Sequence, residues 1–376
     1  MLLTMSNVFI RLTPLDYFFF GGRRTFGSDN ANYFVRSRLF PQQTSVIGLL
    51  RHQMLRKGQE IGESFDAGNS SGQTFGPLQS ISAVFLCKEE GGKPGPDNMY
   101  WVYPLDAQLD EQGENNIKRL AFSLSSNALF LTSDAEGAAW QNASVFSGYD
   151  PKASLIEKRY ANGNGEKAKG KDVFSSTVRV GITKRHRSRP KPDDKEKERG
   201  FYKQEVYKLK NGWSFGFIAE FNNTFDPMEL NDAITPFGGE RSLFKINVSE
   251  QEQPWRQLEK EFNAGPFGPA GGNKFILLSD AFVEKGIYQQ CAGAITQTID
   301  FQNIHTPKGK EVQHAALTDK PKEEKYKLYK SGKYQLLQRG SVLYAADNGE
   351  QLGKLKDALE AAANFRNIGY NQFIIR

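Results

Sequence analysis

Residues 226–248, DPMELNDAITPFGGERSLFKINV, place a glycine turn between a short helix and a strand. The Asp226-Pro227 pair is typical of a helix start, and the β-branched and aromatic residues of 243–248 are typical of a strand. The end of the chain repeats this order, with a helix over 352–365, the turn NIGY at 367–370 and the strand QFII. In each half an opening strand comes first. Such a repeat favours duplicated β-α-β-β-α-β units of the ferredoxin-like kind.

The opening strand and the first helix lie near the N-terminus. Residues 7–20, NVFIRLTPLDYFFF, combine β-branched and aromatic residues and end at Gly21-Gly22, which predicts a strand that leads into a loop. In residues 40–58, FPQQTSVIGLLRHQMLRKG, apolar residues recur at helical spacing. We expect a helix that Thr44 or Ser45 caps and that the glycine at its end stops.

Further strands are expected in the middle of the chain. Residues 80–87 and 99–105 are strand-like and flank the turn GGKPGP, so they predict a hairpin. Residues 173–183 and two runs within 200–221 predict three more strands. Between these segments, residues 184–191 hold five Lys and Arg residues and no acid, which predicts a protruding, basic β-hairpin. Residues 106–172 give mixed signals and receive no assignment.

A change of composition marks the expected domain boundary. The stretch NAGPFGPAGGNK is rich in Gly and Pro, as inter-domain linkers are. We expect an N-terminal ferredoxin-like domain with insertions at 1–255, a linker at 256–274 and a C-terminal ferredoxin-like domain at 275–376. The expected fold class is α+β, with two ferredoxin-like (RRM-like) β-α-β-β-α-β domains, long insertions and the basic β-hairpin.

Composition and charge exclude several classes of protein. The 376 residues suffice for two domains, and the net charge of +6 is mildly basic. Cys87 and Cys291 lie far apart in sequence, which argues against a disulfide framework and a cysteine-rich metal knuckle. Arg11, Pro14 and Asp16 interrupt the apolar N-terminal stretch before it reaches a spanning length or forms a signal-peptide core. We therefore expect a cytoplasmic protein.

The motifs of common catalytic and cofactor sites are missing from the sequence. It contains no GxxxxGK[ST] phosphate loop, no HExxH, no GxSxG and no EF-hand loop. The histidines show no metal-ligand spacing, so we expect no metal and no other cofactor. His52 lies on the first helix beside Arg51, where a bound RNA would meet it as a general base. A surface histidine without a catalytic role is the alternative interpretation.

Basic residues and glycines indicate RNA binding. Arg23 and Arg24 follow the opening strand, and the start of the helix at Thr44 offers unpaired backbone N–H groups to an anion. At residues 238–239 the absence of a Cβ allows close approach of a phosphate or a base, although a tight turn alone requires the same glycines. The basic hairpin tip suits phosphate neutralisation, but its charge does not distinguish it from a solvated loop.

Taken in order, these segments resemble the RAMP (repeat-associated mysterious protein) superfamily of CRISPR proteins. More narrowly, they resemble the subunit of type III-B (Cmr) effector complexes that caps the 5′ end of the CRISPR RNA. The blocks that carry the resemblance span nearly the whole chain: NVFIRLTPLDYFFF with Arg23-Arg24, FPQQTSVIGLLR, STVRVGIT with its basic excursion, GFYKQEVYKLKNGWSFGFIAEF, TPFGGERSLFKI, RGSVLYAADN and NIGYN.

The resemblance implies a non-catalytic, RNA-binding subunit in antiviral defence. It implies that the chain binds the 5′ handle of the CRISPR RNA, docks the large polymerase-like subunit and lies beside the backbone RAMP subunits, with target RNA contacted only indirectly. The family's glycine-rich turn falls on Gly238, Gly239 and Arg241, whereas the second turn, at Gly369, lacks a further glycine and receives no RNA contact. The full set of expected RNA-binding residues is Arg23, Arg24, Thr44, Ser45, Arg51, Arg185, Arg187, Arg189, Gly238, Gly239 and Arg241.

Two alternatives compete with this function. The first is a metal-independent RAMP endoribonuclease that processes precursor CRISPR RNA, with His52 as the base. The second is a protein-only scaffold subunit, whose basic loops contact acidic protein partners.

Overall fold

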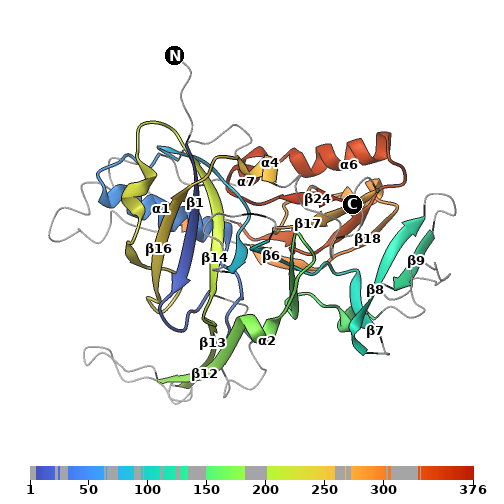
Figure 1. Cartoon of the computed structure of the whole chain (residues 1–376), viewed down its shortest axis with the longest axis horizontal. Helices are drawn as coiled ribbons and strands as arrows, with labels where there is room; N and C mark the ends of the chain where they lie inside the picture. Colours follow the sequence, from blue (N-terminus) through green and yellow to red (C-terminus); the bar gives the residue numbers. More distant parts are fainter. Residues whose placement is uncertain are drawn as a thin grey trace.

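The structure is a computed structural model of the chain. It describes residues 6–21, 24–25, 33–62, 65, 75–88, 95, 97–110, 113–123, 128–133, 150–182, 201–258, 267, 272–301, 304–305, 329–330 and 332–376. Within these ranges the chain forms mostly antiparallel sheets with few helices, so the α+β class is confirmed (Figure 1). No helix in the described part is long and apolar enough to span a membrane.

The largest sheet has nine strands, which run from Ser6 to Glu250. We call this part of the chain the N-terminal half, and the part from Lys274 onward the C-terminal half. Its order is β11-β10-β6-β5-β14-β1-β16-β15, and β4 also pairs with β14. The central strand β1 lies antiparallel between β14 and β16. The bounds are β1 Ser6–Pro14, β4 Leu78–Ile81, β5 Phe85–Lys88, β6 Met99–Val102, β10 Arg159–Asn162, β11 Lys167–Lys169, β14 Trp213–Phe221, β15 Ile234–Pro236 and β16 Leu243–Glu250.

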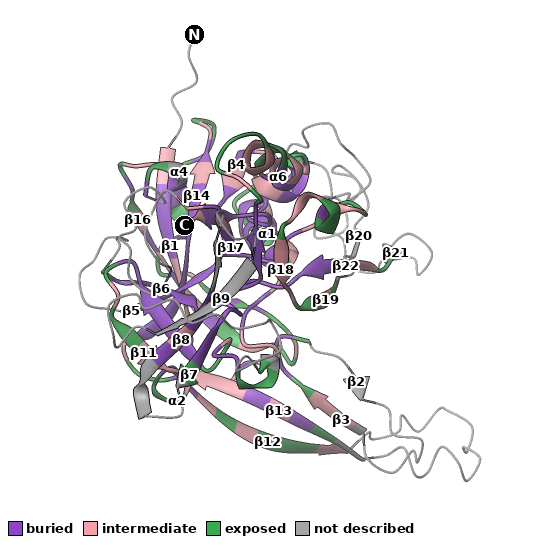
Figure 2. Ribbon diagram, turned by 90° about the vertical axis from the view of Figure 1, so that its right-hand side faces the viewer, coloured by how far each residue is buried: buried purple, intermediate pink, exposed green. Residues whose placement is uncertain are grey.

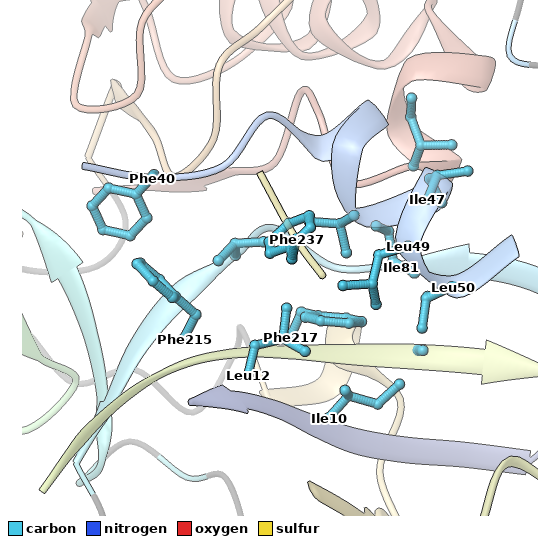
Figure 3. Close-up of a cluster of buried hydrophobic side chains, with 14 of the residues drawn as sticks. Ile10, Leu12, Phe40, Ile47, Leu49, Leu50, Ile81, Phe215, Phe217 and Phe237 are labelled. Carbon is cyan, nitrogen blue, oxygen red and sulfur yellow. The ribbon is translucent and has the colours of Figure 1, made fainter. Parts of the chain in front are cut away.

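Both faces of this sheet are covered at strand β14, whereas β16 alternates between buried and more exposed residues. Ile10 and Leu12 of β1 pack under helix α1 (Gln43–Arg56), which contributes Ile47 and Leu50 (Figure 3). Phe9 points to the opposite face, where the C-terminal half packs. Because side chains alternate along a strand, covering both faces requires a nearly continuous apolar run, and β14 reads WSFGFIAEF for this reason.

The C-terminal half contains a four-stranded antiparallel sheet of order β18-β23-β17-β24. If these four strands are numbered 1 to 4 along the chain, their order in the sheet is 2-3-1-4. Strands β5-β14-β1-β16 of the large sheet, numbered in the same way, have the same order. Alternate residues of the small sheet pack under α6 and against the large sheet. The bounds are β17 Lys274–Leu277, β18 Gly293–Ile295, β23 Val342–Tyr344, β24 Phe373–Ile375, α6 Glu350–Glu360 and α7 Ala363–Asn367.

A third sheet of four strands projects from the body, and we call it the arm (Figure 2). Its order is β12-β13-β3-β2, with β12 and β13 antiparallel over nine residue pairs. The protruding hairpin is therefore confirmed as far as the described residues extend. The bounds are β2 Arg24–Thr25, β3 Tyr33–Arg36, β12 Phe174–Ile182 and β13 Phe201–Leu209.

The remaining elements form small sheets and single turns, in which β8 is the longest strand. Three strands of the unassigned stretch 106–172 form the sheet β7-β8-β9, and β10 and β11 of the same stretch extend the large sheet. Two further pairs are β19 with β22 and β20 with β21. The bounds are β7 Ala107–Asp110, β8 Gly113–Ser123, β9 Ala128–Ser133, β19 Thr298–Phe301, β20 Ile304–His305, β21 Tyr329–Lys330, β22 Tyr334–Leu337, α2 Gly170–Val173, α4 Trp255–Leu258 and the 3₁₀ turns η1 Pro151–Ala153, η3 Pro227–Leu230 and η6 Ile287–Gln290.

Several local predictions differ from the structure in detail. The expected strand 80–87 is split into β4 and β5, which both pair with β14. The two strands expected in 200–221 exist, but β13 belongs to the arm and β14 to the large sheet. Helix α1 starts after Gln42, which makes no side-chain cap, so the predicted cap at Thr44 or Ser45 is wrong. The cap at Asp226 is confirmed, because its carboxylate accepts from the Met228 N–H.

Two apolar clusters and a buried ion pair join the two halves. Trp255 lies among buried residues of both halves, including Phe85 and Ile276. Lys274 Nζ lies 3.0 Å from the buried carboxylate of Asp106. The boundaries predicted at 255 and 275 stay a prediction.

Candidate functional site

The glycine turn of residues 238–241 packs against Phe19 and Phe20, in the segment that follows β1. The Gly239 N–H donates to the Phe19 carbonyl at 2.7 Å. A Cβ on Gly238 would lie 2.7 Å from the same oxygen, and one on Gly239 would lie 2.8 Å from the Phe19 ring. Gly238 also has a φ of 81°, which side chains rarely adopt. The glycines are therefore needed for this close approach of two backbone segments.

Beside this turn lies a cleft of about 370 Å³, which we call the first cleft. One wall is the exposed side of α1, with Ser45, Gly48 and His52, and the opposite wall is the turn with its two glycines. The structure thus brings together three predicted RNA-binding residues, Ser45, Gly238 and Gly239. The complete lining is Phe20, Gly21, Arg38, Gln42, Ser45, Gly48, Leu49, His52, Pro236, Phe237, Gly238 and Gly239.

A second cleft of about 560 Å³ lies between the arm and the C-terminal half. Phe34, Arg36 and Tyr207 of the arm line one side, and Asp280 and Arg339 of the C-terminal half line the other. Arg38 and Gln42 line both clefts. Because they share these two residues, the two clefts lie side by side, and we call them together the groove.

The arginines of the groove differ in how their charge is balanced. Arg36 Nε lies 2.6 Å from Glu205, and Arg339 Nε lies 3.8 Å from Asp280. Arg38 instead donates from Nη2 to the backbone carbonyl of Asp300 at 2.8 Å. No carboxylate in the described part of the chain forms an ion pair with Arg38. Arg38 attracts the Glu157 carboxylate of the same cleft at longer range, so no side chain in the described part neutralises it at contact distance.

Arg339, on the C-terminal side of the second cleft, is held in place by several contacts. Its guanidinium lies 4.2 Å from the centroid of the Phe40 ring and donates to the Val84 carbonyl. Its backbone N–H donates to Asp280. These contacts join three distant parts of the chain and fix the wall of the groove.

Two other ionisable groups line the second cleft. Burial and the neighbouring Glu205 carboxylate raise the pKa of Tyr207 to about 12, so its hydroxyl is neutral at physiological pH. Burial also raises the pKa of the Glu157 carboxyl, which Arg339 partly opposes. Glu157 Oε1 accepts from the Gln338 amide at 3.2 Å. These groups offer the groove neutral and charged hydrogen-bonding partners.

Arg51 does not line the groove, and its predicted RNA contact stays a prediction. It lies on the buried side of α1, where Nε donates to the Ile61 carbonyl and Nη2 to that of Gly62. Burial lowers the pKa of its guanidinium. Arg51 therefore holds the segment that follows the helix.

The other predicted residues fall in several places. Thr44 is half-buried and lines neither cleft, whereas Arg241 is exposed beside the glycine turn with a φ of 53°. The backbone of Arg24 lies in β2, but its side chain lies outside the described residues. Four predicted residues lie wholly outside the described residues: Arg23, Arg185, Arg187 and Arg189.

The second glycine turn has a different position, inside the protein. A Cβ on Gly369 would lie within 1.8 Å of the Gln43 Nε2 atom and 2.3 Å from the Ser82 carbonyl. Gln43 donates to Ser82 O and to Ile368 O, at 2.9 and 3.1 Å. This turn therefore joins the C-terminal half to the start of α1 and lines neither cleft.

The second cleft contains none of the residues that the sequence predicted to bind RNA. Arg36 and Arg38 were a usable signal, because two arginines spaced by one residue follow an aromatic residue in a strand-like stretch. Arg339 and Tyr207 carry no local signal, since they reach the groove only through the packing of the two halves. Among the described residues, no group of three His, Cys, Asp or Glu side chains is arranged to hold a metal.

The class of the chain is that of CRISPR-associated proteins, as its match to a protein family shows. Residues 10–376 match the family described as CRISPR-associated protein (Cas_Cmr3), and the chain belongs to this family. It is therefore a Cmr subunit of a type III CRISPR effector complex. No curated protein matches the sequence.

Three solved structures are similar to the chain at low identity. A chain in the cryo-EM structure of the type III-B Cmr-beta bound to cognate target RNA has a TM-score of 0.48 and 12% identity, with 98% of this chain and 96% of that chain covered. The same complex with AMPPnP gives 0.45 at 12% identity and the same coverage. The Csm3-Csm4 subcomplex of a type III-A interference complex gives 0.30 at 10% identity, with 90% and 92% covered.

Proposed function

We propose that this chain binds the 5′ handle of the CRISPR RNA in the groove and docks the large polymerase-like subunit, beside the backbone subunits of the complex. The observation that carries the RNA-binding proposal is the extent of the groove, whose two clefts share Arg38 and Gln42. It begins at the glycine turn, passes along α1 and reaches the C-terminal half through Arg38 and Gln42. A strand of RNA several nucleotides long fits two neighbouring clefts, whereas a small molecule is usually buried within a single one.

The chemistry of the groove suits single-stranded RNA. Arg38 provides a charge for a backbone phosphate, and Ser45, Gln42 and His52 provide hydrogen-bonding groups along the first cleft. In the second cleft, Phe34 and Tyr207 offer rings on which splayed bases stack. Such stacking contributes about 1–3 kcal/mol per base. The groove thus combines phosphate anchoring with base contacts.

We propose that RNA is held without being cut. Cleavage by a metal-independent mechanism needs an acid and a base at the scissile phosphate. Among the described residues that line the first cleft, His52 and Arg38 are the ionisable side chains, and none is a carboxylate. The competing endoribonuclease function is favoured by one observation, the position of His52 in this cleft. A cleavage assay therefore separates the two.

We further propose that each half is a diverged ferredoxin-like unit. The strand order 2-3-1-4 and the antiparallel neighbours of β5-β14-β1-β16 recur in β18-β23-β17-β24. A helix follows the first strand in the N-terminal unit, as α1, and the third strand in the C-terminal unit, as α6. The groove lies where these two units and the arm meet.

The test is ultraviolet crosslinking of the assembled complex, with mass spectrometry to map the peptides that hold the 5′ handle. We expect crosslinks in residues 34–52 and 236–241, and intact RNA after incubation with EDTA. Crosslinks confined to other subunits would support the protein-only scaffold. Cleavage that His52→Ala abolishes would establish the endoribonuclease instead.

A further inference from the structure

The outer strand of the arm, β12, has one free edge among the described residues. It pairs with β13 through nine consecutive residues, from Phe174 opposite Leu209 to Ile182 opposite Phe201, without a bulge. It is the last strand of its sheet, and Figure 2 shows it along the outer border of the arm. Proteins usually protect such edges with proline, a bulge or a short strand. The described length of β12 contains none of these, and Arg179 is its one charged side chain.

The register identifies the backbone groups that face outward. Lys210 N donates to Val173 O at 2.9 Å, which extends the β12–β13 register by one pair. Because hydrogen-bonded pairs alternate in an antiparallel ladder, the amides of Ser175, Thr177 and Arg179 face β13. The Glu205 carbonyl, opposite Val178, accordingly turns to the other side and accepts from Ser37 N.

It follows that the outward-facing N–H and C=O groups belong to Ser176, Val178 and Val180. Val178 and Val180 also expose 51% and 62% of their surface, on the face they share with Glu205 and Lys203. β-Branched side chains in strands are stabilised by packing against a neighbouring strand, and none flanks this edge among the described residues. Among the described residues, the edge thus lacks both backbone and side-chain partners on one side.

The charge around the edge indicates the kind of strand that fits. On the valine face, Glu205 is paired with Arg36, which leaves the positive charge of Lys203. On the other face, Arg179 and Lys208 lie 3.8 and 4.0 Å from the single carboxylate of Asp16, which leaves another positive charge. Two copies of this edge would therefore repel each other, whereas a strand with acidic flanks would be attracted.

We propose that β12 is a docking strand for an extended, acidic segment of another protein subunit of the effector complex, which adds to the arm as a fifth strand. Backbone hydrogen bonds to Ser176, Val178 and Val180 would hold the segment, and apolar side chains would cover the two valines. An extended peptide offers alternating N–H and C=O groups that match the outward groups of β12, whereas the phosphates of RNA only accept hydrogen bonds. The proposal does not depend on RNA binding in the groove.

Hydrogen exchange at single-residue resolution tests this, with the full chain alone and in the assembled complex. Strand addition slows the amides of Ser176, Val178 and Val180 at least tenfold on assembly. The alternate amides change little, because β13 already protects them. This two-residue period distinguishes strand addition from a contact that only covers the arm. Unchanged exchange at the three outward amides overturns the proposal.

Substitution of Val178 gives a second test with a matched control. Val178→Pro removes one outward N–H, a change that edge strands tolerate, whereas Val178→Ala keeps it. We expect the proline variant to bind a complex assembled without this chain at least tenfold more weakly than the alanine variant does. Slow exchange of the Thr177 and Arg179 amides shows that the arm of the proline variant stays folded. If the arm unfolds, the test is the exchange pattern of the unmodified chain. Equal binding of both variants, protection lost on removing RNA, or dimers of the isolated chain in sedimentation would each refute the proposal.

Discussion

Gly369→Ala should uncouple the C-terminal half from the start of α1. Its new methyl group would lie 1.8 Å from Gln43 Nε2 and 2.3 Å from the Ser82 carbonyl oxygen, far inside van der Waals contact. The oxygen belongs to the backbone and cannot rotate away. The Gln43 amide can move only by giving up its hydrogen bonds to Ser82 O and Ile368 O.

The expected loss of stability follows from these contacts. A φ of 86° costs an alanine about 1–2 kcal/mol relative to glycine. Overpacking in a buried site adds about 1–3 kcal/mol. A displaced Gln43 amide adds roughly 1–3 kcal/mol when its buried donors lose their acceptors. We therefore expect a decrease of at least about 3 kcal/mol in the free energy of unfolding, which for a chain of this length lowers Tm by about 4 °C.

Urea unfolding followed by circular dichroism and tryptophan fluorescence measures this loss, since Trp255 lies at the interface between the halves. Gly353→Ala is the matched control. Gly353 lies within α6, and a methyl group there would meet no atom within 4 Å, so alanine should stabilise the chain by up to about 1 kcal/mol through helix propensity. If Gly369→Ala costs less than about 1 kcal/mol, or if Gly353→Ala destabilises equally, the packing argument is wrong.

The remaining predictions concern the arginines of α1 and the groove, and one tyrosine. Arg38→Gln should weaken binding of 5′-handle RNA about tenfold at fixed ionic strength and lower the salt slope by about one, while Arg56→Gln, at the end of α1 outside the groove, should change little. Equal effects in anisotropy titrations would contradict the assignment of Arg38. Arg51→Ala should lower the free energy of unfolding by about 1–3 kcal/mol, because the Ile61 and Gly62 carbonyls lose their donor, yet leave RNA affinity within twofold. Because the pKa of Tyr207 is raised to about 12, its contribution to stability is complete below pH 10 and is lost as the pH rises to 12. Between pH 10 and pH 12, the free energy of unfolding should decrease less for Tyr207→Phe than for the unmodified chain. An equal decrease in both would refute the pKa shift.

Local pattern was sufficient for most of the elements. Helix α1, strand β1 and the cap at Asp226 each depend on residues close together in sequence, and each was predicted near its observed position. The assignment of β13 and β14 to different sheets was not predictable in this way. It depends on β3 and β1 as pairing partners, which lie far away in the chain.

Ordered motifs along the chain were sufficient to identify the family, although each motif is weak on its own. The sequence also determined the glycine turn at 238–239, since only glycine allows that approach to Phe19. The tertiary structure alone decided which arginines reach the groove. Arg51 and Arg38 look alike in the sequence, yet Arg51 is buried against the segment after α1, whereas Arg38 is oriented by the carbonyl of Asp300, 262 residues away. Burial and hydrogen-bond partners of this kind arise from packing between distant segments, so no local pattern encodes them.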